Sequence, residues 1–144
     1  MTALTTTNNT TSSLKAGIAA GLIGGLVFGM MMGMMGALPM VGMLIHVDSA
    51  IVGFIVHMGI SATIGAIYGI VAARLPQKTG VTALAGIVNG IIWWVLGALI
   101  MMPLMLGMSD MVFAIGQTQW FSLMGHIIFG VITAFAFIPL SKRL

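Results

Sequence analysis

Two histidines stand inside long apolar stretches of this sequence, His57 and His126. A small residue lies one helical turn to either side of each: Gly53, Ser61, Ser122 and Gly130. An ionisable group within a bilayer costs several kcal/mol unless it is paired or turned inward, so such a residue indicates a function. Two imidazoles facing one another across a slot of small side chains could be the axial ligands of a haem b. They could equally be structural, bonded to one another or to the serines.

Methionine is the second residue type with possible chemistry. Most of the fifteen methionines lie in two stretches, residues 30–43 and 101–111. Thioether sulfur together with imidazole is a ligand set that suits Cu(I), and the candidate sulfur ligands are Met31, Met35, Met101 and Met105. Methionine is also a flexible apolar residue that fills gaps between helices. Copper ligation is therefore a less favoured prediction than simple packing.

Catalytic signatures are missing from the sequence. It contains no phosphate-binding loop, no GxSxG and no HExxH. There is no cysteine, which excludes disulfides, thiolate metal sites and thiol catalysis. The two acidic residues, Asp48 and Asp110, are far apart in the sequence and form no carboxylate pair. We therefore expect a protein that is not an enzyme.

The composition shows which elements must position these residues. The chain has 144 residues, of which 60% are hydrophobic and 5% charged, whereas a soluble domain carries about 25% charged residues. About 20 apolar residues suffice to cross a bilayer as a helix. The uncharged runs predict an all-α polytopic membrane protein with four transmembrane helices, near residues 16–37, 50–73, 82–106 and 120–140. Residues 16–144 then form one domain, and the polar residues 1–15 are expected to be a disordered tail.

The distribution of charge predicts the orientation. Four spans put both termini and the middle loop on one side, and that side holds all five Lys and Arg residues, whereas both Asp residues lie on the other. Positive residues favour the cytoplasm, so we expect both termini to be cytoplasmic. The formal net charge of +3 then reflects this bias, and no nucleic-acid partner is expected. Pro103, near the end of the third span, should kink that helix.

An internal repeat appears when the chain is shifted by 69 residues against itself. The shift aligns AGIAAGLI with AGIVNGII, and it pairs His57 with His126 and Arg74 with Arg143. Each half holds two helices, so the halves have the same orientation. They are expected to be two parallel repeats related by a pseudo-two-fold axis along the membrane normal. This symmetry places the two histidines at one depth, facing one another.

Glycine recurs every fourth residue in the first span, at Gly17, Gly21, Gly25, Gly29 and Gly33. The second span carries Gly65 and Gly69 in a similar column. Stripes of this kind let helix backbones approach closely in a membrane. The predicted interface is either internal to the bundle or shared with a second copy or another subunit.

The assembled pattern resembles a known group of proteins. A histidine-bearing helix is followed by a basic loop with proline, by WWVLGALIMMPLMLGM from Trp93, and by SLMGHIIFG around His126. This order, over about residues 50–140, resembles the YagU-like group of small bacterial and archaeal inner-membrane proteins. The resemblance implies a four-helix architecture in a prokaryotic cytoplasmic membrane and a stress or accessory role. It implies no ligand and no catalytic residue.

Three functions remain open at this point. The first is a non-enzymatic accessory subunit, whose glycine-lined faces pack against other membrane proteins or further copies of the chain. The second is a membrane protein that binds haem b or Cu(I) through His57 and His126. The third is a small transporter or channel, which the internal repeat favours and the scarcity of polar residues in the cytoplasmic half disfavours.

Overall fold

A computed structural model describes the backbone of residues 2–144 and the side chains from Asn9 onward. It contains four helical spans that are long and apolar enough to cross a membrane. They are α1 (Thr2–Met34), α3 (Ala50–Ala72), α6 (Gln117–Ser141) and a third span built from α4 (Thr79–Trp93), the π-helical segment η2 (Trp94–Met101) and α5 (Met102–Met105). Short helices α2 (Leu38–Gly42), η1 (Met43–Ile45) and η3 (Ser109–Met111) lie in the connections. The prediction of an all-α multi-pass membrane protein is confirmed.

The structure differs from the sequence prediction at the N-terminus. Residues 2–15, expected to be a disordered tail, continue α1 as helix from Thr2. No proline or glycine interrupts this stretch, and extending an existing helix costs far less than nucleating one. The Ser13 hydroxyl also donates to the Asn9 carbonyl at 2.8 Å, one turn back. Polar composition alone therefore did not end the helix.

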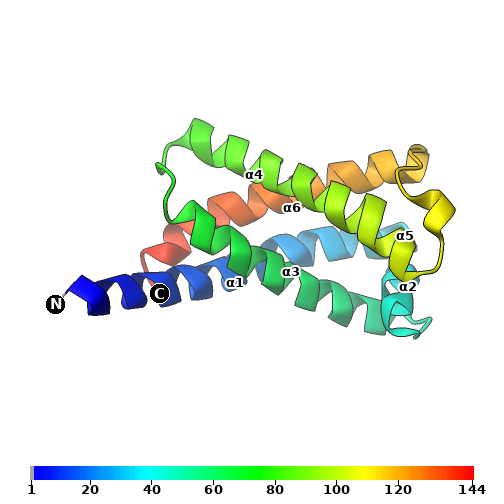
Figure 1. Cartoon of the computed structure of the whole chain (residues 1–144), viewed down its shortest axis with the longest axis horizontal. Coiled ribbons are helices and arrows are strands. Elements are labelled where there is room, and N and C mark those ends of the chain that lie inside the picture. Colours follow the sequence, from blue (N-terminus) through cyan, green and yellow to red (C-terminus); the bar gives the residue numbers. More distant parts are fainter. Residues whose placement is uncertain (1) are drawn as a thin grey trace.

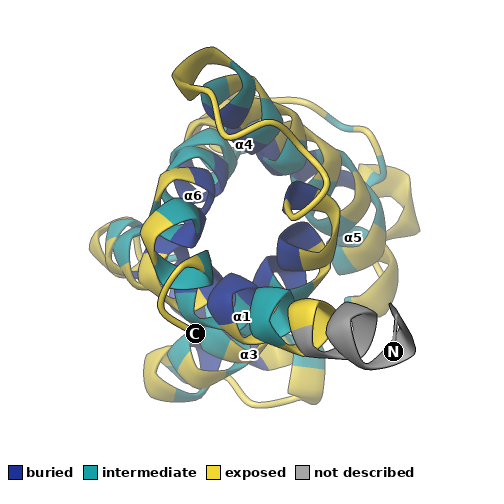
Figure 2. Cartoon of the chain, turned by 90° about the vertical axis from the view of Figure 1, so that its left-hand side faces the viewer, coloured by how far each residue is buried: buried dark blue, intermediate teal, exposed yellow. Residues whose placement is uncertain are grey.

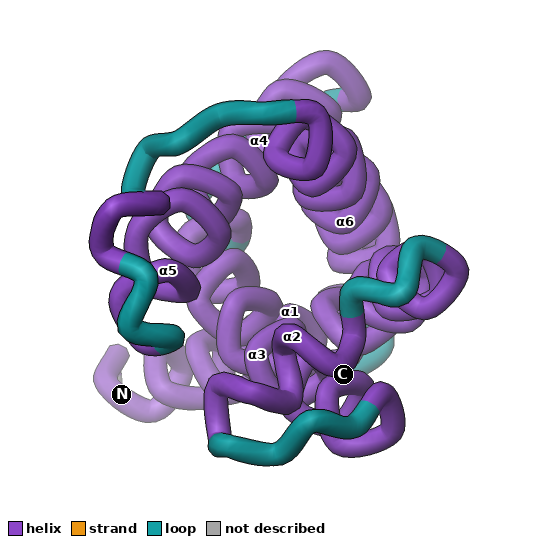
Figure 3. Tube along the Cα trace, turned by 90° about the vertical axis from the view of Figure 1, so that its right-hand side faces the viewer, coloured by secondary structure: helices purple, strands orange, loops and turns teal. Residues whose placement is uncertain are grey.

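The helices pack in the spatial order α3, α1, α6, α4. Both termini and the loop between α3 and α4 lie at one end of the bundle, called here the termini end (Figure 1). Helices α2 and α5 lie at the opposite end, called the loop end, where α2 packs against α3 (Figures 1 and 3). Buried residues face the inside of the ring of helices, and exposed residues face outward (Figure 2). Helix α3 and the third span share no extensive contact.

The glycine stripe of α1 is used within the chain. A Cβ atom on Gly21 would lie 2.7 Å from Gly65 Cα, and one on Gly17 would lie 2.9 Å from Gly69 Cα. Gly25 packs against Ser61, so four of the stripe positions, Gly17 to Gly29, contact α3. Gly33 is exposed and has only the Leu38 side chain near it. The stripe therefore serves the close approach of α1 and α3.

Helices α4 and α6 pair in the same way, through small residues. A Cβ on Gly86 would lie 2.8 Å from Val131 Cα, and one on Gly90 would lie 2.9 Å from Ile127 Cα. The similarity ends at Trp94, which is the repeat equivalent of Gly25. The indole of Trp94 is buried and donates from Nε1 to the Gln119 carbonyl at 3.0 Å. A buried indole therefore stands in the second half at the position that Gly25 occupies in the first.

The third span is irregular where a kink at Pro103 was expected. Instead of a simple kink, the eight residues before α5 form the π-helical segment η2. Proline has no N–H, so Pro103 leaves the carbonyl of Leu99 without its usual helical donor. The backbone N–H of Phe113 donates to Leu99 O at 3.2 Å. Phe113 has a φ of 57°, in the left-handed region.

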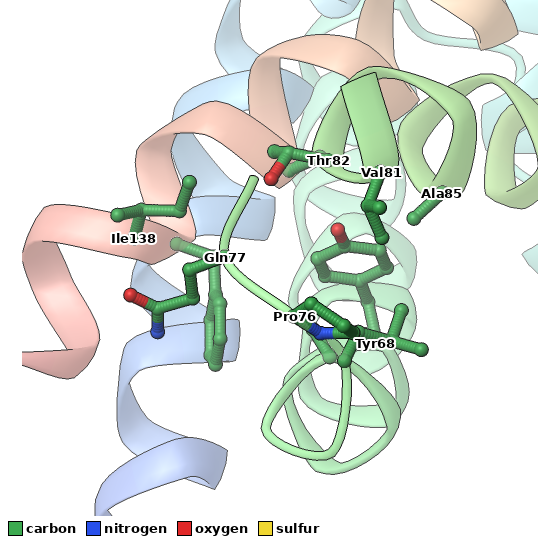
Figure 4. A pocket seen from close by; sticks show the side chains of 11 residues that line it. Tyr68, Pro76, Gln77, Val81, Thr82, Ala85 and Ile138 are labelled. Carbon is green, nitrogen blue, oxygen red and sulfur yellow. The ribbon is translucent and has the colours of Figure 1, made fainter. Parts of the chain in front are cut away.

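The termini end of the bundle is closely packed. Its core holds Ala16, Ala20, Tyr68, Ala72, Ala134 and Phe137. The rings of Tyr68 and Phe137 meet edge to face, with centroids 6.0 Å apart. A cavity of about 10 Å³ lies beside Tyr68, Pro76 and Thr82, where the loop between α3 and α4 folds over the helices (Figure 4). That volume holds about one water molecule.

Candidate functional site

A much larger cavity lies in the loop-end half of the bundle, between α3 and η2. Its volume is about 550 Å³, and we call it the lateral cavity. Helix α1 and helix α6 supply its inner wall. The residues that line it are Phe28, Met32, Val41, Leu44, Val56, His57, Gly59, Ile60, Thr63, Ile64, Trp93, Gly97, Ala98, Met101, Met102, Met105, Ser122 and His126. The structure thus brings both predicted histidines to one cavity with mostly apolar walls.

His57 reaches the lateral cavity from α3 and is fixed by α1. Its side chain is 7% exposed. Nε2 donates to the backbone carbonyl of Gly25 at 2.9 Å, across the α1–α3 contact. Ser61 Oγ lies farther away, 3.5 Å from the same nitrogen. The close approach that Gly25 permits therefore also brings an acceptor to the imidazole.

His126 is fixed by its own helix instead. Its Nδ1 donates to the carbonyl of Ser122 at 2.8 Å, and Ser122 Oγ lies 3.4 Å from the same nitrogen. A bond to the neighbouring helix, as His57 makes, is not formed. In the second half Gly90 packs on the backbone of His126 itself, whereas its repeat equivalent Gly21 packs on Ser61 and Gly65, so the second helix pair is shifted by about one turn. The two histidines are thus equivalent in sequence but anchored through opposite ring nitrogens.

The tautomer of each neutral imidazole follows from these bonds. A carbonyl oxygen only accepts, so the proton lies on Nε2 of His57 and on Nδ1 of His126. The second nitrogen of each ring, His57 Nδ1 and His126 Nε2, then carries a lone pair. Neither has a hydrogen-bond partner among the described residues. Among the described residues, the fully buried polar side-chain atoms without a hydrogen-bond partner are Asn89 Nδ2 and Thr133 Oγ1. His57 Nδ1 and His126 Nε2 are not among these buried atoms, so both histidine nitrogens remain accessible.

Phe28 changes the geometry expected for the histidine pair. Its ring meets that of His57 edge to face at 5.4 Å and that of His126 at 4.9 Å, measured between centroids. Phe28 thus packs against both imidazoles. Two of the flanking small residues serve helix packing, since Gly53 packs on the Leu38 backbone and Gly130 on Gly86. Binding of haem b by the pair stays a prediction, and His57 Nε2 is already engaged by Gly25 O.

The predicted methionine ligands are only partly brought together. Met101 and Met105 line the lateral cavity, whereas Met31 packs against the core around Phe28 and Met35 is 48% exposed. Cavity-lining methionines that the sequence prediction did not select are Met32 and Met102. Within residues 9–144, no group of three or more His, Asp or Glu residues could hold a metal ion. The methionines thus form a polarisable wall of the cavity.

The lateral cavity opens between α3 and the third span. Gly59 lies on one side of this opening and Gly97 on the other, and a Cβ on either would meet no atom within 4 Å. Ile60 and Met101, which also line the cavity, are 41% and 53% exposed. On a protein whose helices cross a bilayer, exposed apolar side chains of this kind face lipid. The opening is therefore directed sideways into the hydrocarbon.

Two aromatic residues of the site were not identified from the sequence as cavity residues. Phe28 lies in a uniformly apolar stretch, where no change of residue type distinguishes it from its neighbours. The one nearby signal is the glycine stripe, which includes the next residue, Gly29. The mid-span position of Trp93 and Trp94 predicts that at least one of the two rings packs inside the bundle or against a partner. The Trp93 indole Nε1 donates to Asn89 Oδ1 at 3.2 Å, one turn back, and its ring lines the lateral cavity.

Comparison of this chain with protein families, with curated proteins and with solved structures finds no match. The resemblance to the YagU-like group therefore stays a prediction. The site has to be interpreted from its own residues. Among the residues that the structure describes, those of the site form an apolar, laterally open cavity, and two imidazoles in its wall are held by hydrogen bonds.

Proposed function

We propose that this protein binds a lipid-soluble small molecule in the lateral cavity. The observation that carries the proposal is a pair of imidazoles that line one apolar cavity, each held by a backbone carbonyl and each with a second nitrogen that has no hydrogen-bond partner among the described residues. Ligand sites typically combine apolar walls with a few fixed polar groups and enclose about 300–1,000 Å³. The volume of about 550 Å³ lies within that range.

The route of entry supports a ligand that comes from the membrane. The opening beside Gly59 and Gly97 faces hydrocarbon, whereas the termini end is closed by the core around Tyr68 and Phe137. A ligand dissolved in the hydrocarbon would reach the histidines directly through this opening. This arrangement favours binding over passage through the bundle, so the channel hypothesis has less support than it had from the repeat.

The accessory-subunit hypothesis loses its main argument. It depended on glycine-lined faces that need partners, and the stripe from Gly17 to Gly29 already packs against α3. A role within a larger assembly, or as a homo-oligomer, stays a prediction that no contact within the chain supports. We further propose a non-enzymatic protein of a prokaryotic cytoplasmic membrane with its termini end in the cytoplasm. The support is charge, since Arg74, Lys78, Lys142 and Arg143 lie at that end.

The experiment compares two glycines at which added bulk meets no atom. Gly97→Phe would project a ring into the opening of the lateral cavity, and Gly80→Phe, near the start of α4, would not. In lipid nanodiscs, 4-decyl-2-bromophenol should quench tryptophan fluorescence saturably, because Trp93 lines the cavity and bromine quenches on contact. We expect Gly97→Phe to weaken this binding at least tenfold and Gly80→Phe to leave it unchanged. Equal binding by both variants, or quenching that never saturates, would contradict the proposal.

A further inference from the structure

We infer that the lateral cavity selects ligands that donate hydrogen bonds, specifically a hydroxyl group on an aromatic ring such as a phenol or hydroquinone. The inference deepens the proposed function and rests on it. It follows from which polar atoms the cavity offers to a ligand. These atoms are set by hydrogen bonds that the chain already makes.

Four donors of the lateral cavity are already engaged, and the Ser122 hydroxyl is the exception. The ring N–H of His57 donates to Gly25 O, and that of His126 donates to Ser122 O. The Thr63 hydroxyl donates to the Gly59 carbonyl at 3.0 Å, and the Trp93 indole donates to Asn89. A ligand that only accepts hydrogen bonds therefore finds none of these four donors free.

The acceptors, in contrast, are open. His57 Nδ1 and His126 Nε2 each carry an unbonded lone pair on a ring that lines the lateral cavity, and a neutral imidazole nitrogen without a proton only accepts. Both rings are expected to be neutral, since no carboxylate lines the cavity and an unpaired charge within hydrocarbon is costly. The Ser122 hydroxyl both donates and accepts, so it does not discriminate between ligands. A ligand hydroxyl can donate to the unprotonated imidazole nitrogen, whereas a ketone or an ether oxygen only accepts and cannot bond to that nitrogen.

The walls indicate the rest of the ligand. Phe28 and Trp93 are aromatic residues on the cavity surface, and sulfur atoms from Met32, Met101 and Met105 belong to the same lining. Aromatic rings pack favourably on one another and on thioether sulfur. The opening toward lipid leaves room for an alkyl tail to remain in the hydrocarbon. A hydroxylated aromatic ring with a lipid tail thus matches the acceptors, the walls and the opening together.

The test uses two probes that differ at one oxygen: 4-decyl-2-bromophenol and its methyl ether. Ring, bromine and tail are the same, and only the phenol can donate. In nanodiscs carrying the full chain, we expect the phenol to bind at least tenfold more tightly than the ether. Equal saturable binding of both probes would overturn the donor preference and leave the proposed binding function standing. Absence of saturable binding by either probe would overturn both.

Histidine variants identify the source of the preference. His126→Phe is the first choice, because His126 bonds within its own helix and the change keeps an aromatic ring of similar size. We expect this variant to lose most of the preference for the phenol, so that the ratio of phenol affinity to ether affinity falls toward one. His57→Phe is the second variant, with folding checked by its thermal transition. A phenol preference that is unchanged in both variants would overturn the assignment to the imidazoles.

Discussion

Replacing Gly65 by alanine should push α1 away from α3. The added Cβ would lie 2.6 Å from Gly21 Cα, where ordinary contact begins at 3.4 Å, so this contact alone requires the two backbones to separate by about 0.8 Å. Gly17 O would be closer still, and all these atoms are backbone that cannot rotate away. A gap of that size forfeits about a quarter to a half of each dispersion contact. Overpacking of this kind typically costs about 1–3 kcal/mol.

Gly59→Ala is the matched control on the same helix. Its Cβ meets nothing within 4 Å, so only helix propensity changes, and alanine is favoured there by about 0.5–1 kcal/mol. Both variants would be unfolded in mixed micelles with increasing dodecyl sulfate, with helicity and tryptophan emission as readouts. We expect a lower midpoint for Gly65→Ala and an equal or higher one for Gly59→Ala. Similar midpoints for the two variants would refute the close α1–α3 contact.

Three further predictions concern other parts of the bundle. Thr133→Val should raise the unfolding midpoint, because a buried hydroxyl without a hydrogen-bond partner costs about 1–3 kcal/mol and the substitution removes it. A lower midpoint would show that the hydroxyl is bonded. Trp94→Phe should cost about 1 kcal/mol in the same assay, since the Gln119 carbonyl loses its donor; no change would contradict this. Single cysteines at Ser49 and Thr79 should differ toward an impermeant thiol reagent in intact cells, with only Ser49→Cys labelled; the reverse would overturn the orientation.

The spans could be predicted because charge and apolar length determine them. Seven charged residues mark the ends of four long apolar runs, and the structure places the second span at Ala50–Ala72, within one residue of the expected 50–73. The role of Gly17 and Gly21 as contact residues also followed from their spacing. Their partner did not, since a stripe of small residues carries no information about which helix approaches it.

The geometry of the site was harder to predict, for two physical reasons. The sequence places His57 and His126 at one depth, but not Phe28 against both rings, because one phenylalanine in a uniformly apolar helix has no distinguishing pattern. The repeat suggested equivalent histidines, yet the second helix pair is shifted by about one turn, since Gly90 packs on His126 whereas its equivalent Gly21 packs on Ser61 and Gly65. His57 bonds to Gly25 of the neighbouring helix, and His126 bonds to Ser122 of its own helix. The alignment of the two halves does not show this shift in helix pairing.

The central claim is that two neutral imidazoles with opposite tautomers offer their lone pairs to one membrane cavity. Solid-state ¹⁵N NMR of the histidine-labelled protein in lipid bilayers measures this directly, with His57→Phe and His126→Phe used to assign the signals. The structure predicts that His57 carries its proton on Nε2 and His126 on Nδ1. It also predicts that 4-decyl-2-bromophenol shifts the unprotonated nitrogen of each ring. The same tautomer in both rings, or unprotonated nitrogens that do not respond to the phenol, would contradict the account.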